Sequence, residues 1–198
     1  MPGPPIARVI ICRSNGEPRD NRKVMPAVEN QKLTLAEFHS RYNGTKPYYE
    51  YWAGEAVQKS MPTWLHALIQ KILLQLLDSI GYESAAEVTL KLDPAYEPIP
   101  DVIAVEGVIA HPYPTTPFDL AIEILSPEDS FSRTLRKCRL YAQWGIRRIL
   151  VIDPAVRLIR SFEDGVPKET DFVARRGELA ISAQTLWDEV DRHSSPSK

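Results

Sequence analysis

Two carboxylates stand in apolar segments where a buried strand has no packing reason for charge. Asp101 opens the run VIAV, and Glu123 lies inside the run LAIEIL. Charged carboxylates are rarely buried without a partner, and a divalent cation between two of them keeps both ionised. Mg²⁺ binds through carboxylates, water and phosphate oxygens, activates water and offsets the charge of a phosphoryl transition state. The pair therefore predicts a metal site suited to phosphate ester hydrolysis.

Structural interpretations of the same two residues stay open. Asp101 follows Pro100 and could simply cap the start of a strand. Glu123 could form a buried ion pair with an arginine. Either alternative would leave the protein without a metal site.

An amine near the carboxylates would position or deprotonate the attacking water. A helix is expected over 132–144, after a short turn that follows the strand of Glu123. Its expected buried stripe is Phe131, Leu135, Cys138 and Ala142. Lys137 and Tyr141, four residues apart, lie along one margin of that stripe, where a long amine can reach the carboxylates while its stem packs on apolar neighbours.

Arginines flank Lys137 at Arg133, Arg136 and Arg139. This basic series is compact enough to meet the phosphate backbone of a nucleic acid. A solvated basic helix face explains the same pattern, so the charge alone does not discriminate between the two interpretations.

Several further residues are secondary candidates for the site. His66 falls on the edge of the apolar stripe of a helix, where a core histidine bonded to a backbone carbonyl is the alternative to a site residue. The other secondary candidates are Glu50, Glu55, Glu87, Asp119 and Tyr141. Each of them also has a structural interpretation.

The elements that must position these residues alternate between strands and helices. The surest helix spans 63–80, with an apolar stripe of Leu65, Ile69, Ile72, Leu73, Leu76 and Ile80. Strands are expected on both sides of a turn at Ala53 and Gly54, over 83–92, and in the runs VIAV, LAIEIL and ILVIDP. Because LAIEIL is apolar on both faces, it should be a central strand. The pattern predicts an α/β domain with a mixed sheet flanked by helices.

Composition excludes some classes of protein. The 198 residues carry a formal net charge of -2, which gives no global attraction to nucleic acid, and two cysteines form neither a disulfide framework nor a zinc pattern. No apolar run approaches the roughly 18 residues of a membrane helix. We expect a protein of the cytoplasm without membrane contact.

The proline-rich residues 1–30 are expected to form an extended arm, residues 31–190 a single domain, and the polar residues 191–198 a mobile tail. A capping box formed by Thr34 and Glu37 predicts a short helix at the start of the domain.

Three ordered segments together resemble one known family. PDVIAV, then DLAIEILSPEDS, then RKCRLYAQWGIRRILVIDP, with YYEYWAGE and the helix of His66 upstream, resemble the Uma-two endonuclease-like family of the PD-(D/E)XK nuclease superfamily. The resemblance runs from about Leu33 to Trp187 and implies a restriction-endonuclease-like core. Residue by residue, it places Asp101 on the metal-binding aspartate and Glu123 on the second acid.

The superfamily's lysine does not match directly, because its usual position two residues beyond the acid holds Leu125 here. The resemblance suggests that the amine has moved to the following helix as Lys137. On that hypothesis, Lys137→Met should leave fold and metal binding intact and lower only cleavage.

Two functions follow as expectations. The resemblance implies a Mg²⁺-dependent endonuclease that hydrolyses DNA by metal-activated water, with Mn²⁺ substituting, no small-molecule cofactor, and a homodimer as one compatible assembly. The alternative is a catalytically inactive nuclease fold that serves as a DNA-binding or partner-binding module, since Leu125 replaces the usual lysine.

Overall fold

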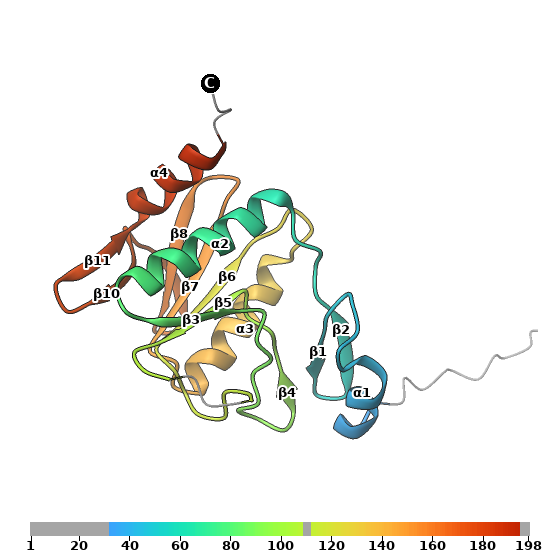
Figure 1. Cartoon of the computed structure of the whole chain (residues 1–198). Coiled ribbons are helices and arrows are strands. Elements are labelled where there is room, and N and C mark those ends of the chain that lie inside the picture. Colours follow the sequence, from blue (N-terminus) through green and yellow to red (C-terminus); the bar gives the residue numbers. More distant parts are fainter. Residues whose placement is uncertain (1–31, 109–111, 195–198) are drawn as a thin grey trace, which may run out of the picture. The chain divides into compact units, whose positions relative to one another are not determined.

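The computed structural model describes residues 32–108 and 112–194 and is built around a six-stranded mixed sheet in the order β3-β5-β6-β7-β8-β9 (Figure 1). Its strands are β3 (Glu83–Ala86), β5 (Val102–Val105), β6 (Leu120–Ile124), β7 (Arg148–Asp153), β8 (Leu158–Glu163) and β9 (Val166–Glu169). A smaller sheet contains β2 (Glu55–Gln58), β1 (Tyr49–Trp52) and β4 (Tyr96–Glu97). A separate hairpin pairs β10 (Phe172–Arg176) with β11 (Leu179–Ser182).

Helices cover both faces of the large sheet (Figure 1). Helices α2 (Trp64–Ser79) and α4 (Ala183–Ser194) lie on one face and α3 (Phe131–Gln143) on the other, whereas α1 (Leu35–Tyr42) packs against β1 of the smaller sheet. Side chains of β6 alternate between the two faces, as a strand requires: Ile122 packs with residues of α2 and α4, whereas Ala121 packs with residues of α3. The predicted class, an α/β fold with a mixed central sheet flanked by helices, is confirmed.

Strand β6 is central, as its two apolar faces predicted. All five of its residues are buried, and it pairs antiparallel with β5 and parallel with β7. A parallel neighbour requires a crossover connection, and α3 supplies it. This connection carries α3 across the face of the sheet onto which Glu123 points.

Two predicted elements differ from the structure. The strand expected over 83–92 ends at Ala86, because Glu87 adopts a φ of 58°, a left-handed conformation that no strand continues through. The stripe of α2 is rotated from the expected one. Leu65 is 37% exposed, and the buried residues of the helix are His66, Leu68, Ile69, Ile72, Leu73 and Leu77.

The predicted termini are tested only in part. The expected arm over 1–30 lies outside the described residues. At the other end, α4 runs to Ser194 and therefore extends into the segment 191–198 that was assigned to the tail. In the described part of the chain, no helix is long and apolar enough to cross a membrane.

Helix α2 is anchored at its start by Thr63, whose side chain accepts a hydrogen bond from the backbone N–H of His66. Thr63→Ala removes this N-cap and should lower the free energy of unfolding by about 1 kcal/mol. Chemical denaturation measures the change. Thr115→Ala, at an exposed threonine outside the helices, is the control and should have little effect. An equal loss in both variants would show that the cap contributes nothing.

Candidate active site

The register of β5 on β6 brings the two predicted carboxylates together. Val102 pairs with Ile122 and Ile103 with Ala121, so continuing the register by one residue sets Asp101 opposite Glu123. Side chains in such opposed positions are direct neighbours. Asp101 is 2% exposed and Glu123 6% exposed, and both line one pocket of about 40 Å³, which is room for a few waters or a small ion.

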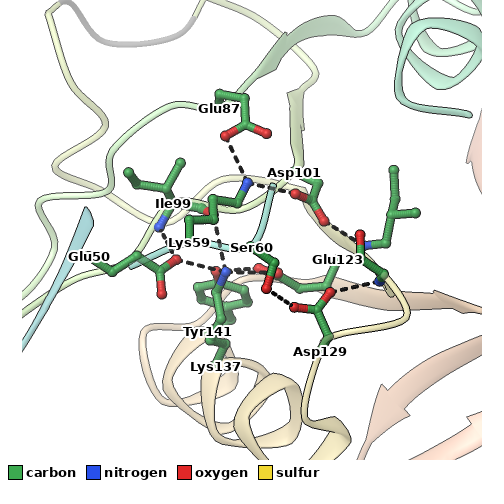
Figure 2. Close-up of polar contacts among 12 residues, drawn as sticks. Glu50, Lys59, Ser60, Glu87, Ile99, Asp101, Glu123, Asp129, Lys137 and Tyr141 are labelled. Carbon is green, nitrogen blue, oxygen red and sulfur yellow. Dashed lines mark hydrogen bonds and ion pairs between the residues drawn. The ribbon is translucent and has the colours of Figure 1, made fainter. Parts of the chain in front are cut away.

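Lys137 reaches this pocket from α3 (Figure 2). Its Nζ lies 2.8 Å from Glu123 Oε2 and 2.9 Å from Glu50 Oε1, and it donates to the backbone oxygen of Ile99 at 3.1 Å. The Tyr141 hydroxyl donates to Glu123 Oε1 at 2.7 Å. Three acceptors match the three N–H groups of an ammonium, so this buried charge is satisfied.

The helix face that meets the sheet is therefore not the expected one. Lys137 and Tyr141 are buried, instead of lying along a margin, and Phe131 is 39% exposed. The remaining buried residues of α3 are Thr134 and Cys138. The prediction considered only apolar residues. Lys137 and Tyr141 are buried because Glu123, on the sheet, accepts their hydrogen bonds.

The hairpin of β1 and β2 adds a third carboxylate. Glu50 is buried and accepts hydrogen bonds from the Trp52 indole at 3.0 Å and from the backbone N–H of Ile99 at 2.8 Å. These bonds hold its other contact, to Lys137, in place. Glu55, in contrast, is exposed and is not part of the pocket lining, so the structure does not bring this candidate to the site.

Lys59 is a charged site residue that the sequence analysis missed, and Ser60, Gln70, Ser126 and Asp129 are further site residues that it did not name. It follows β2, and its Nζ donates to Asp101 Oδ1 at 2.6 Å and to Glu87 Oε2 at 2.8 Å (Figure 2). The other oxygen of Asp101 accepts the backbone N–H of Ile124 at 2.6 Å. No periodic signal marks Lys59, because it lies in the irregular segment that joins β2 to α2.

His66 is a pocket residue, and among residues 32–108 and 112–194 its ring has no backbone carbonyl partner of the kind expected for a core histidine. Its Nδ1 is 3.0 Å from the Ser126 hydroxyl. Its Nε2 lies 3.3 Å from Asp101 Oδ1, yet in the described part of the chain this buried atom makes no hydrogen bond of acceptable geometry. One turn further along α2, Gln70 donates to Glu87 and to the backbone oxygen of Asp101.

Burial and neighbouring charges push the pKa values of the two central carboxyls apart. Burial alone would raise the pKa of Asp101, but Lys59 and His66 outweigh it and hold this pKa below its usual value. Burial raises the pKa of Glu123 to about 7, with Lys137 opposing the shift. Such divergence between two adjacent carboxyls is common at functional sites.

The two lysines stay charged in this setting. Burial lowers the pKa of each amine, but Glu123 and Glu50 more than compensate at Lys137, as Asp101 does at Lys59, so both pKa values are raised. Lys137 is thus an ammonium over the whole neutral range.

The predicted basic series divides between the pocket and other surfaces. Arg133 is exposed and lines the pocket. Arg136 lies over the Trp52 ring, with its guanidinium carbon 4.8 Å from the ring centroid. Arg139 is exposed and is not part of the pocket lining. Asp119, at the other end of β6, pairs with Arg147 at 3.0 Å and has a structural role.

One group of side chains has the donor set and spacing of a metal site. Single ligand atoms of His66, Glu87 and Asp101 all lie within 4.8 Å of one another. Carboxylate oxygens and a neutral imidazole nitrogen are ordinary ligands of divalent cations. Glu123 is outside this group, because both of its oxygens already face Lys137 and Tyr141.

Comparison with known proteins gives a family and a fold. The profile of the Uma2 family, described as "Putative restriction endonuclease", matches residues 35–187. A crystal structure of a "putative nuclease belonging to DUF820" from Anabaena variabilis ATCC 29413 aligns with a TM-score of 0.69 at 23% identity, over 80% of this chain and 99% of that one. This likeness shows the fold.

A cryo-electron microscopy structure of a DrdV–DNA complex aligns with a TM-score of 0.36 at 17% identity, over 66% of this chain and 11% of that one. None of the curated proteins matches the chain.

Proposed function

The chain belongs to the Uma2 family of restriction-endonuclease-like proteins, and from this premise we propose that it is a Mg²⁺-dependent endonuclease that hydrolyses DNA phosphodiester bonds. The observation that carries the proposal is the convergence of buried Asp101, Glu123 and Lys137 on one pocket. Burying several charged groups together costs free energy that apolar side chains would not cost. Such a cluster therefore favours a catalytic role.

The residues present fit a divalent cation. Asp101 and Glu123 are the acids that we propose to hold it, and binding by Glu123 requires one of its oxygens to leave Lys137 or Tyr141. The buried Nε2 of His66 lies 3.3 Å from Asp101 Oδ1 and makes no hydrogen bond among the described residues, so it can add a nitrogen ligand. When bound, Mg²⁺ would lower the pKa of a water and offset charge on the phosphate.

Lys137 serves this reaction as a fixed positive charge. Because its pKa is raised and its three N–H groups already have acceptors, it would stabilise the charge of the transition state and would not take the proton. Tyr141 orients Glu123 through a hydrogen bond, and Glu50 orients Lys137 through an ion pair.

DNA would approach along the N-terminal end of α3. Arg133→Gln, at the pocket mouth, should weaken DNA binding and reduce the slope of log affinity against log salt by about 0.9, the loss of one phosphate contact. Fluorescence anisotropy with EDTA present measures this. Arg147→Gln, beside Asp119 at the far end of β6, is the control and should keep the wild-type slope. Equal slopes in both variants would place the DNA elsewhere.

A non-catalytic module remains the second candidate, and one observation favours it. Lys59 and Lys137 already neutralise the two acids, so the pocket is electrostatically satisfied without metal. Plasmid cleavage decides between the candidates. Nicking by the wild type that needs Mg²⁺, stops with EDTA and is absent in Asp101→Asn supports the nuclease, whereas DNA binding without any nicking supports the module. The homodimer and the cytoplasmic location stay predictions.

A further inference from the structure

Lys59 lies where a cation beside Asp101 would lie (Figure 2). Its ammonium is 2.6 Å from Asp101 and 2.8 Å from Glu87, and its side chain is only 13% exposed. The amine therefore neutralises two acids whose side chains are themselves 3% and 24% exposed. A single positive charge thus lies in contact with both acids.

The substitution is incomplete at His66. The residue is 5% exposed, and its Nε2 lies 3.3 Å from Asp101 Oδ1 but makes no hydrogen bond to any residue that the structure describes. A buried polar atom without a hydrogen bond is costly, because it has lost its hydration without a replacement. A lysine ammonium satisfies the two carboxylates but leaves this nitrogen unused, whereas a divalent cation would engage all three side chains.

The spacing of the three side chains suits such an exchange. Their ligand atoms lie within 4.8 Å of one another, whereas in an octahedral Mg²⁺ site neighbouring ligands are about 3.0 Å and opposite ligands about 4.2 Å apart, so the group must close by less than about 2 Å. A second pocket of about 290 Å³ adjoins the group, and Lys59 lines it together with Tyr48, Met61 and Gln70. It gives the displaced side chain a place to go.

We propose that Lys59 is an internal counter-ion that a divalent cation must displace in order to bind His66, Glu87 and Asp101. The inference deepens the proposed function, on which it rests, by adding a cation position beside the Asp101–Glu123 pair. The displaceable amine keeps the acids neutralised when metal is scarce and sets the metal concentration at which the position fills.

Metal binding tests the proposal without any assay of cleavage. Lys59→Gln keeps an N–H donor for Asp101 but loses the charge, so it should bind Mn²⁺ about tenfold more tightly than the wild type, a change of ~1.4 kcal/mol. Free Mn²⁺ is followed by electron paramagnetic resonance during titration of the folded, metal-free protein. Lys59→Met, which also loses the donor, should show the same gain if it folds.

Two matched variants make the result specific. Lys46→Gln removes a charge from the same second pocket, at an exposed residue that lies against the Tyr48 ring, and should keep wild-type affinity. In Lys59→Gln/His66→Ala the gain should disappear, because the imidazole ligand is gone. Both results together support displacement.

Other outcomes overturn the inference. Unchanged or weaker Mn²⁺ binding by Lys59→Gln would make Lys59 a structural partner only. If Lys59→Gln bound one more Mn²⁺ than the wild type, with an unchanged affinity for the first Mn²⁺, Lys59 would be a permanent occupant of the position that no metal displaces. A wild type that neither binds Mn²⁺ nor cleaves DNA would refute the proposed function, yet a His66-dependent gain in Lys59→Gln would still support this inference.

Discussion

Lys137→Met should lower DNA cleavage by about 10²- to 10⁴-fold and lower the free energy of unfolding by about 3–5 kcal/mol. The first effect follows from losing the fixed charge beside Glu123. The second follows because Met leaves both Glu123 and Glu50 buried without their cation. Single-turnover cleavage and urea denaturation measure the two effects separately.

The stability effect corrects the expectation, drawn from the sequence, that this substitution would leave the fold intact. That expectation assumed an amine at the margin of the helix stripe, whereas Lys137 is buried in a network of acids. Adding Glu50→Gln to Lys137→Met should recover part of the stability but none of the cleavage. A Lys137→Met protein with wild-type stability and activity would show that the amine has neither role.

Asp101→Asn should abolish cleavage, with a loss of about 10³-fold or more, because a neutral amide is a poor ligand for a hard cation and a poor partner for the Lys59 ammonium. The same variant should be less stable than the wild type at neutral pH. Asn can also present an N–H group to the Ile124 amide, which now donates to Asp101 Oδ2.

The pH dependence of this stability difference has a definite sign. The pKa of Asp101 is lowered in the folded protein, so the ionised group contributes stability above its unfolded pKa of about 4 and loses that contribution as the pH falls below it. The gap between the wild type and Asp101→Asn should therefore narrow as the pH falls below about 4. Thermal melts across this range measure it, and a gap that widens in acid would contradict the assignment of Asp101 as a charged partner of Lys59.

Much of the architecture could be predicted from local pattern. The apolar runs that contain Asp101 and Glu123 predicted two strands, and the pairing of these strands in the structure sets the two acids opposite each other. The capping box of α1 was equally visible, because it depends on residues close in sequence. These features are decided by local conformation and by burial.

The details of the site depend on contacts between distant segments. Lys59 reaches Asp101 across 42 positions of sequence, and no period or motif marks a lysine in an irregular connection. Lys137 and Tyr141 were predicted too near the surface, because a stripe defined by apolar residues does not take into account that Glu123 accepts hydrogen bonds from both side chains. Glu87 became a site residue only because the chain leaves β3 with a left-handed turn there.

A crystal soaked in Mn²⁺ tests the central claim most directly, since Mn²⁺ is located by its anomalous scattering. The account predicts a peak within coordination distance of an Asp101 carboxylate oxygen, with the Lys59 ammonium moved away from it, and no such peak in crystals of Asp101→Asn. A map without a peak at Asp101 at millimolar Mn²⁺, with Lys59 still on Asp101 and Lys137 still on Glu123, would contradict a metal-dependent nuclease and leave the non-catalytic module.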